Sequence, residues 1–491
     1  MKKTMRLLAI TLSVAILALS FAGCDCGNSF PPDELVEWIS EDFKNALFDA
    51  SKDDTVMRYD SDGELIPIKI NNYPTYAELA EVEYLHIGLF RAKNLEALDL
   101  SDIKKFPAIK ELYIESKSVT NIEALSELVN LKTLSFQEST GVSDLSLIAG
   151  LTNLENLSLD RCEDVSDLSP IAGLTKLESL DISSTKISDL SPIAELTNLE
   201  TLNISFAGVS DISPIVGLTN LKTLGISACT GISDISPLSR LTNLQEIKAS
   251  SLNVTDWSPI AKLSNLETLW ISDGEVSDLS PIAGLTNLKE LSISFTEVSD
   301  LSPIAKLTKL ERLYILYTET FDLSALAGLT NLKYLNMSFT KSSDLSPLTN
   351  LTKLEELRID FCTGVSDLSP IAKLTNLEIL DVSNTKISDL SPLSGLVNLE
   401  LLGISVTAVS DLSPLAGLTN MRSLYVNSCT AVSDLSPLAG MTNLKDLDIS
   451  NTEVSDLSPL SGLTNLRELS AYQTKVTDWS PVAHVTKVYK E

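Results

Sequence analysis

Histidine is scarce in this chain: His86 and His484 are the only two among 491 residues. This scarcity removes most imidazole-based catalysis and most His-ligated metal chemistry. The sequence also lacks a glycine-rich phosphate loop, a Gly-x-Ser-x-Gly elbow and a Cys-x-x-Cys pair. We therefore expect a protein that is not an enzyme and that has no catalytic residues, no metal site and no cofactor.

Basic residues are also few. Lysine and arginine total 37 against 66 aspartates and glutamates, which gives a net charge of −29. Such a chain has no basic field for phosphate backbones, so we expect no nucleic acid among its partners. Hydrophobic residues make up 44% of the chain, which is ample for a packed core.

The first residues have the layout of a secretory signal, with three basic side chains before an uncharged apolar stretch at 7–22. Cys24 follows in the context Phe-Ala-Gly-Cys, which resembles the bacterial lipoprotein processing box, although Phe21 stands where leucine is usual. The resemblance implies a signal peptide over 1–23 and a lipid on Cys24 that anchors the chain outside the cytoplasm, at the cell membrane or cell surface. The alternative is ordinary signal cleavage, with Cys24 and Cys26 as incidental thiols.

Residues 24–80 do not repeat, and apolar side chains in their first part recur at every fourth residue, as on one face of a short helix. These side chains are Leu35, Ile39, Phe43 and Leu47. Asp33 stands where the N-cap of that helix belongs. We interpret 24–80 as an N-terminal helical cap, which would cover unpaired strand edges at the start of the segment that follows.

The remainder of the chain, 81–491, consists of one repeat. Equivalent positions follow one another at steps of 22 or 23 residues. They are Ile109, Leu131, Leu154, Leu177, Leu199, Leu221, Leu244, Leu266, Leu288, Leu310, Leu332, Leu354, Leu377, Leu399, Met421, Leu444 and Leu466. Two weaker units, around Val82 and Leu95, extend the array toward the N-terminus.

Each unit combines a strand pattern with a turn pattern. The alternation Leu180-x-Ile182 has period two, which predicts a short strand with one side in the core. Ser191 and Pro192 then predict an N-cap hydroxyl and a first-turn proline, the start of a brief helical turn. This Ser-Pro pair recurs in fourteen of sixteen units.

The pattern Leu-x-x-Leu-x-Ile-x-x-Thr-x-Val-Ser-Asp-Leu-Ser-Pro resembles the bacterial leucine-rich repeats of the internalin type, over about 82–488. The resemblance implies an α/β solenoid, a right-handed leucine-rich-repeat horseshoe. Such a solenoid has a parallel concave β-sheet, short 3-10 or helical turns on the convex side and, here, the N-terminal cap. It also implies a concave face that holds protein partners. Internalin-like proteins usually carry an immunoglobulin-like domain after the repeats, whereas this sequence stops at Val488-Tyr489-Lys490-Glu491. We therefore do not expect host-cell adhesion to carry over automatically.

Four cysteines, Cys162, Cys229, Cys362 and Cys429, occupy the same position in their units and lie at least three units apart. At about 4.8 Å per strand their separation is about 14 Å, beyond the reach of a disulfide. We interpret them as buried apolar side chains.

A column of aspartates, one per unit, precedes the helical turn. Its members are Asp144, Asp167, Asp189, Asp211, Asp234, Asp256, Asp278, Asp300, Asp322, Asp344, Asp367, Asp389, Asp411, Asp434, Asp456 and Asp478. Aspartate readily bonds the backbone two or three residues on, so capping of the turn is the first interpretation. A calcium-binding rib is the alternative, although one carboxylate per repeat is sparse for that ion.

Aromatic residues are only 5% of the chain, yet they cluster at outward or rim positions over five adjacent units. With two arginines and a leucine, the cluster comprises Trp270, Phe295, Arg312, Tyr314, Leu316, Tyr317, Tyr334, Phe339, Arg358 and Phe361. Tryptophan, tyrosine and arginine dominate binding hot spots. We therefore predict a partner-binding site centred on Trp270, Tyr314 and Tyr334. Its further members are Phe295, Arg312, Tyr317, Phe339 and Arg358. For three phenylalanines, Phe295, Phe339 and Phe361, the alternative is that they tuck into the turn as packing.

The sequence thus predicts a monomeric, lipid-anchored recognition module that binds a protein, or a glycan, on a rigid concave face. The alternative is a passive structural envelope protein or a self-associating spacer. In that case the exposed C-terminal edge, weakly covered after Tyr472, would stack on another copy.

Overall fold

A computed structural model describes residues 35–36, 38, 40–50, 56–59, 65–68, 70, 74–87 and 97–490. The predicted signal peptide and Cys24 lie outside these residues. The chain divides into two compact units: unit 1 ends at Leu244 and unit 2 begins at Gln245.

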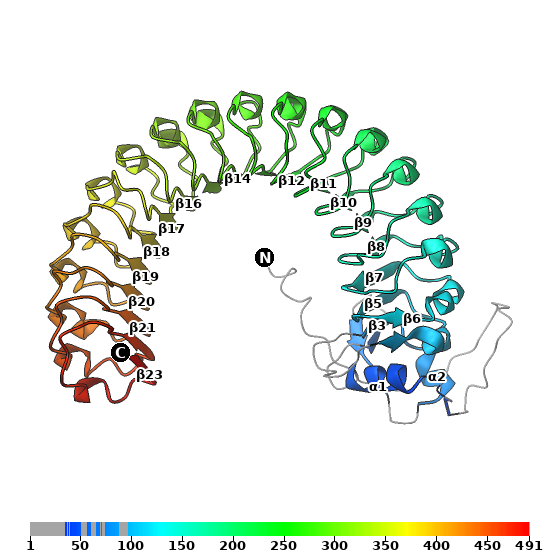
Figure 1. Cartoon of the computed structure of the whole chain (residues 1–491), viewed down its shortest axis with the longest axis horizontal. Coiled ribbons are helices and arrows are strands. Elements are labelled where there is room, and N and C mark those ends of the chain that lie inside the picture. Colours follow the sequence, from blue (N-terminus) through cyan, green and yellow to red (C-terminus); the bar gives the residue numbers. More distant parts are fainter. Residues whose placement is uncertain are drawn as a thin grey trace. The chain divides into compact units, whose positions relative to one another are not determined.

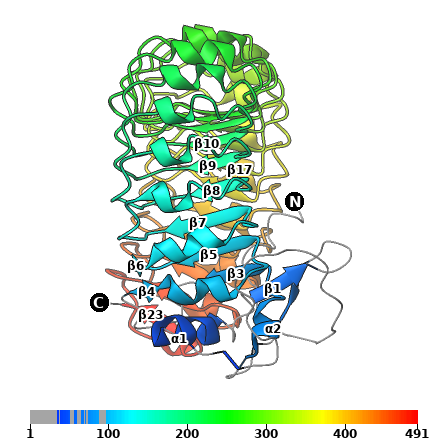
Figure 2. The ribbon, with the colours of Figure 1, turned by 90° about the vertical axis from the view of Figure 1, so that its right-hand side faces the viewer.

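Unit 1 begins with a cap, which Figure 2 shows beside the first repeats. The cap contains α1 (Glu41–Ala50), β1 (Val56–Tyr59), β2 (Leu65–Pro67) and α2 (Tyr76–Leu79). β1 pairs antiparallel with β2 and also with β3 (Tyr84–Ile87), the first strand of the repeats. Because β1 occupies the free edge of β3, the cap protects that edge from pairing with another chain.

The cap helix begins later than the sequence indicated. α1 starts at Glu41, because the Ser40 hydroxyl accepts a hydrogen bond from the backbone N–H of Phe43 at 3.1 Å and thereby caps the helix. Leu35, which the spacing placed on the helix, lies in an isolated antiparallel bridge instead and is 60% exposed. Phe43 and Leu47 are buried. Outside the described residues lie Asp33 and Ile39.

The first repeat is one long unit and not the two weak units that the sequence suggested. β3 pairs in parallel with β5 (Glu111–Glu115), whereas β4 (Leu98–Asp99) pairs with β6 (Val119–Thr120) in a separate small sheet. β4 therefore belongs to the repeat that starts at Val82, in the part of that repeat that follows the main-sheet strand β3. The apolar side chains after Leu95 resembled a strand of the main sheet because both halves of a repeat bury leucine. Leu95 itself lies outside the described residues.

The other strands of unit 1 follow in order along one parallel sheet. They are β7 (Thr133–Gln137), β8 (Asn156–Ser158), β9 (Ser179–Asp181), β10 (Thr201–Asn203) and β11 (Thr223–Gly225). The 3-10 turns are η1 (Leu100–Lys105), η2 (Ile122–Glu127), η3 (Leu145–Ile148), η4 (Ser169–Ile171), η5 (Ser191–Ile193), η6 (Ser213–Gly217) and η7 (Ser236–Arg240).

Unit 2 repeats the same arrangement. Its strands are β12 (Glu246–Lys248), β13 (Thr268–Trp270), β14 (Glu290–Ser292), β15 (Arg312–Tyr314), β16 (Tyr334–Asn336), β17 (Glu356–Arg358), β18 (Ile379–Asp381), β19 (Leu401–Gly403), β20 (Ser423–Tyr425), β21 (Asp446–Asp448), β22 (Glu468–Ser470) and β23 (Lys487–Tyr489). Each pairs in parallel with the next.

The turns of unit 2 are also 3-10 helices. They are η8 (Ser258–Lys262), η9 (Ser280–Ile282), η10 (Ser302–Lys306), η11 (Ser324–Gly328), η12 (Ser346–Leu348), η13 (Ser369–Ile371), η14 (Ser391–Leu393), η15 (Ser413–Leu415), η16 (Ser436–Gly440), η17 (Ser458–Leu460) and η18 (Ser480–Val482). In each unit, Figure 1 shows the strands on the inner side of the curve and these turns on the outer side. The predicted parallel sheet with short 3-10 turns is confirmed.

The core is a stack of identical layers between the strands and the turns. One layer illustrates this: its strand side contributes three fully buried side chains, Leu310, Leu313 and Ile315. Ile304 and Leu307, from the turn before it, are fully buried as well. Since each layer is covered mainly by its neighbours, positions that face away from the core are free to vary without loss of packing.

The aspartate column caps the turns, as the first interpretation held. Asp189 Oδ1 accepts a hydrogen bond from the Ser191 N–H and Oδ2 accepts one from the Ser191 hydroxyl, both at 2.8 Å. The backbone bond recurs in all sixteen units of the column. The predicted role of the serine as N-cap is wrong, because Leu190 holds the cap position and Ser191 is already the first residue of the turn.

Candidate binding surface

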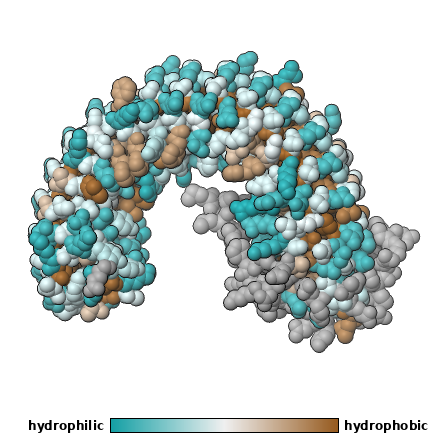
Figure 3. Space-filling model, in the orientation of Figure 1, coloured by the Kyte–Doolittle hydropathy of each residue, from teal (hydrophilic) through white to brown (hydrophobic). Residues whose placement is uncertain are grey.

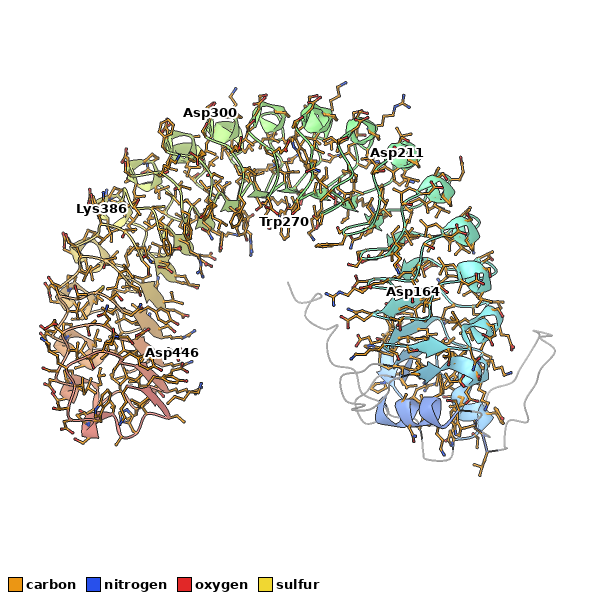
Figure 4. The ribbon with its side chains drawn as sticks, in the orientation of Figure 1. Asp164, Asp211, Trp270, Asp300, Lys386 and Asp446 are labelled. Atoms are coloured by element: carbon orange, nitrogen blue, oxygen red, sulfur yellow. The ribbon has the colours of Figure 1, made fainter. Side chains whose placement is uncertain are left out.

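Trp270 lies on the strand face of unit 2, where the even positions of β13 point away from the core. Trp270 is 36% exposed, and Figure 4 places it on the inner side of the unit, while Asp300 lies on the outer side. Trp270 Nε1 donates a hydrogen bond to Glu290 Oε1 at 2.9 Å. The Lys248 ammonium lies 5.2 Å from the ring centroid. The two neighbouring strands therefore fix the orientation of the indole, which reduces the entropy that a partner would have to remove.

Tyr314 and Tyr334 form a ring pair on the same face. The register of β15 and β16 places Arg312 opposite Tyr334, so the two tyrosines are diagonal neighbours. Their ring centroids are 4.7 Å apart and their planes are inclined by 39°. Both rings are half-buried. Burial, with a smaller contribution from Glu356, raises the pKa of Tyr334, so its hydroxyl is a neutral donor and acceptor at physiological pH.

Two arginines border the tyrosine pair and differ in their pairing. Arg358 Nε contacts Glu356 Oε1 at 2.6 Å. Arg312 is exposed, and the hydrogen bond to Tyr314 is the largest cause of its raised pKa. Among the residues that the structure describes, no carboxylate lies within 4 Å of the Arg312 guanidinium. The Arg312 guanidinium is thus positively charged and can donate hydrogen bonds to a carboxylate of a partner.

The rim of the sheet carries a stack of four rings from four adjacent repeats, which we call the aromatic ladder. Its rungs are Phe295, Tyr317, Phe339 and Phe361. Successive centroids are 5.3, 4.9 and 4.1 Å apart, with planes inclined by 17°, 29° and 9°. The side chains are 51%, 55%, 38% and 40% exposed, in chain order. The alternative that Phe295, Phe339 and Phe361 tuck into the turn is therefore wrong.

The backbone explains why these rings point outward. Each ladder residue has a left-handed conformation, with φ between 56° and 58°, and ends the extended part of its repeat. Its N–H donates to a carbonyl of the following repeat, as Phe295 does to Leu316 at 2.9 Å. The next residue, such as Thr296, turns into the core in its place, where its hydroxyl donates to the Ile293 carbonyl at 2.6 Å. The left-handed residue is thereby directed toward solvent.

The sequence contains a signal for this orientation. In most other repeats the left-handed position holds a polar residue, such as Ser184, Asn384 or Asn451, although Phe206, Ala228 and Val406 also occupy it. When equivalent positions of successive repeats mostly hold polar residues, their side chains are expected to be exposed to solvent. Asn is also one of the residues that adopt the left-handed conformation readily. Figure 3 shows hydrophobic atoms gathered on the inner side of unit 2 around β16 and β17, amid a hydrophilic surface. Leu316, also in the predicted cluster, is half-buried.

The four repeat cysteines are buried and free. Burial raises the pKa of Cys162 to about 12, and burial is also the largest cause of the raised pKa values of Cys229 and Cys362. Such thiols are poor nucleophiles and poor metal ligands at neutral pH. Within the described residues, no group of three or more His, Cys, Asp and Glu side chains is arranged to hold a metal ion.

The two histidines have local partners. His86 Nε2 lies 3.2 Å from Glu115 Oε1 in unit 1, and the hydrogen bond is the largest cause of the lowered pKa of Glu115. His484 Nε2 lies 2.9 Å from the Leu463 carbonyl oxygen in unit 2. No helix in the described part of the chain has the length and apolar character needed to cross a membrane.

Parallel strands at steps of 22 or 23 residues, joined by 3-10 turns, define a leucine-rich-repeat solenoid. The family described as Leucine Rich repeats (2 copies) matches residues 175–207, 197–240, 352–395 and 442–484. Proteins of this class are typically non-enzymatic and commonly bind protein partners through the extended surface of the solenoid. A search of curated proteins found no match.

Solved structures identify the type of repeat. An internalin, InlF, from Listeria monocytogenes is 34% identical, with a TM-score of 0.55, and the similarity covers 58% of this chain and 84% of that one. This chain belongs to the internalin-type leucine-rich-repeat proteins, as the repeat pattern predicted.

Two further structures share the fold. A leucine-rich-repeat protein from Leptospira interrogans is 21% identical, with a TM-score of 0.66, over 76% of this chain and 97% of that one. The functional domain of InlJ from Listeria monocytogenes is 20% identical, with a TM-score of 0.55, over 82% of this chain and 77% of that one.

Proposed function

We propose that this chain is an extracytoplasmic recognition module that binds a protein partner on the strand face of unit 2, at Trp270, Tyr314 and Tyr334. The proposal includes a signal peptide at 1–23, a lipid anchor at Cys24, a cap over 24–80 and a solenoid over 81–491. The acyl chains on Cys24 would then attach the protein to a membrane.

The observation that supports this site is the contrast between β13, β15 and β16 and the strands β9 to β11. In unit 1 the outward positions of β9 to β11 hold Ser179, Asp181, Thr201, Asn203, Thr223 and Gly225. On β13, β15 and β16 four of the six outward positions hold Trp270, Arg312, Tyr314 and Tyr334, and the other two hold Thr268 and Asn336. The orientation of these large aromatic side chains is already fixed, so they lose little entropy on binding. They also bury a large area, and both properties are typical of binding hot spots.

The rigid sheet also favours binding without rearrangement. Trp270 is held by Lys248 and Glu290, and Tyr314 is held by Tyr334. Arg312 offers a guanidinium to a carboxylate of the partner. A protein surface with an apolar centre and an acidic group at its edge would therefore match this patch.

The test compares capture of partners from envelope and host extracts by wild-type protein and by a Trp270→Ser, Tyr314→Ser, Tyr334→Ser variant. The matched control is Tyr425→Ser, which removes an exposed tyrosine from β20 outside the patch. We expect one partner to bind the wild type and the control alike, and to bind the triple variant at least about tenfold more weakly. Equal retention by all three proteins, with equal melting temperatures, would reject the site.

A second candidate function is self-association through the last strand of unit 2. β23 pairs with β22, and Tyr489 on β23 stacks with Tyr472, with centroids 6.3 Å apart and both rings exposed. Exposed aromatic side chains beside a strand edge are suited to pairing with another copy. Sedimentation at increasing concentration distinguishes the two: a monomer throughout rejects this candidate.

A further inference from the structure

The aromatic ladder consists of residues other than Trp270, Tyr314 and Tyr334, and its rings stack with one another. We propose that the ladder is a second contact strip, and that it takes a basic amphipathic helix of a protein partner rather than a glycan or a second copy of this chain. The inference rests on the proposed function, because it names the class of partner, but it has its own residues and its own test.

The ladder residues are not required by the fold. The same left-handed turn forms with Ser184 in unit 1 and with Asn384 in unit 2. A bulky aromatic side chain is a costly occupant of this conformation, whereas Asn adopts it readily. The exposed rings also contribute little to the core. A row of four such residues in consecutive repeats is therefore explained by what the surface contacts.

The stacking of the rings argues against a glycan. Sugars bind aromatic residues by lying flat against a free ring face. In the ladder, the faces between Phe295 and Tyr317, between Tyr317 and Phe339, and between Phe339 and Phe361 are covered by the neighbouring ring. The strip accordingly offers mainly ring edges, which make an apolar ridge for aliphatic side chains.

Charge argues against a second copy and in favour of a basic partner. Glu297 is exposed two residues beyond the first rung, and Asp273 and Glu275 are exposed at the corresponding positions of the repeat before it. Lys341 is basic, but it is paired with Glu319. The whole chain carries −29, so two copies repel each other, while lysine and arginine beside an apolar stripe would be attracted to these carboxylates.

The rung spacing favours a helix over an extended segment. Neighbouring rings are 4.1 to 5.3 Å apart. Side chains on one face of a strand recur at about 6.6 Å, whereas those at positions i, i+3, i+7 and i+10 of a helix recur at about 4.5 to 6 Å along the axis. An apolar helical stripe can thus contact all four rungs at once.

The test uses three synthetic helices as probes: one with a leucine stripe flanked by lysines, one with the same stripe flanked by glutamates, and one with lysines but serine in place of leucine. Each is titrated against the full chain, against a variant with Phe295→Ser, Tyr317→Ser, Phe339→Ser and Phe361→Ser, and against Phe206→Ser. Phe206 is a matched control, because it is 66% exposed at the same left-handed position but stands outside the ladder.

We expect the leucine–lysine helix to bind wild type and Phe206→Ser equally and to bind the ladder variant at least tenfold more weakly, with binding reduced by salt in all cases. The other two helices should bind at least tenfold more weakly than the first. Equal affinity of the leucine–lysine helix for wild type and ladder variant overturns the proposal. Stronger binding of the glutamate helix also overturns it, as does a dimer in sedimentation that the ladder variant abolishes.

The outcomes separate this inference from the proposed function. If the ladder variant still captures the partner that the Trp270→Ser, Tyr314→Ser, Tyr334→Ser variant loses, the strand-face site stands and the ladder proposal falls. If the ladder variant loses the helix and the partner while the strand-face variant keeps both, the ladder is the site and the strand-face proposal falls. Melting curves of each variant identify any loss that is due to unfolding.

Discussion

Phe339 and Phe361 belong to neighbouring repeats, yet their ring centroids are 4.1 Å apart and their planes differ by only 9°. The two backbones have the same left-handed φ of 58°. Each residue also donates its N–H to a carbonyl of the next repeat at 2.9 Å. The stacking of the side chains therefore follows from the translation of one turn geometry along the solenoid.

The ladder should contribute much less to stability than the core layer beneath it. Phe339→Asn loses ring contacts of about 0.5–1.5 kcal/mol each but gains a residue suited to the left-handed turn, so we expect a small net change. Leu335→Ala, at a fully buried position of the same repeat, should cost about 2–5 kcal/mol. Denaturant unfolding of both variants measures the difference. Equal destabilisation would mean that the ladder is part of the structural core.

The aspartate caps should make stability fall in acid. Ten aspartates in the column have lowered pKa values, because each accepts hydrogen bonds from the serine two residues later. They include Asp144, Asp389 and Asp411. A lowered folded-state pKa contributes stability above the unfolded value near 3.8, and this contribution is lost as pH falls through the folded-state value. Burial raises the pKa values of Asp160 and Asp360, so these two carboxyls favour stability in acid. They are outnumbered by the ten aspartates whose pKa values are lowered.

We therefore expect a melting temperature that changes little between neutral pH and about pH 5 and that drops below about pH 4. Asp389→Asn is the matched variant, because its amide oxygen still accepts the Ser391 N–H while the charge is gone. It should reduce the acid sensitivity slightly. A melting temperature that is constant down to pH 2 would contradict this account of the column.

The cap should depend on one buried ion pair. Asp102 and Lys105 are both buried and contact each other, and Asp102 Oδ2 also accepts the Ser40 N–H at 2.8 Å just before α1. Asp102→Ala would leave a buried ammonium without this carboxylate, at a cost of about 3–5 kcal/mol. Hydrogen exchange should then accelerate in α1 more than in β15. Lys222→Ala, from an exposed pair with Glu200, is the control and should change stability by less than about 1 kcal/mol. Unchanged exchange in α1 would contradict the prediction.

The repeat thiols should be unreactive in the folded protein. Because burial raises the pKa of Cys162 to about 12, a thiol reagent at pH 8 should leave this residue unmodified. Cys229, Cys362 and Cys429 are buried as well, out of reach of the reagent, and should also stay unmodified. In denaturant all four should react. Peptide mass analysis assigns the modified positions. Rapid labelling of any of the four in the native state would show that its layer opens.

Cys24 provides the test of the proposed anchor. Expressed with its signal sequence in a bacterial host, the wild type should incorporate labelled fatty acid and partition into detergent. Cys24→Ser should not, while Cys26→Ser should behave as the wild type. Labelling of both variants, or of neither wild type nor variant, would contradict lipidation at this position.

Repetition made most of the fold predictable, because a period of 22 or 23 residues fixes which positions share a layer. The buried column that contains Leu313 and Ile315 needed no further information. Local bonding competed with the pattern elsewhere: Ser40 and not Asp33 sets the start of α1, and Asp189 and not Ser191 caps its turn. The identity of the capping group depends on the path of the backbone, which spacing alone does not determine.

The candidate site was predictable in part for the same reason. Alternation along a strand places Trp270 and Tyr314 outward, and the structure has both there. Phe339 and Phe361 follow the strand, where alternation no longer applies and a single left-handed residue reverses the direction of the side chain. Their stacking is a contact between repeats, and it depends on a backbone angle that the apolar pattern does not encode.

The left-handed column has a consequence for engineering. It presents one solvent-directed side chain per repeat on a backbone that is held by hydrogen bonds to the next repeat and that accepts serine, asparagine or phenylalanine. Asn384 occupies the repeat directly after Phe361, so Asn384→Phe would lengthen the ladder by one ring, and Phe295→Asn would shorten it by one. The length of the exposed aromatic strip on this scaffold is therefore adjustable in single-repeat increments, by substitutions at positions that lie outside the core layers.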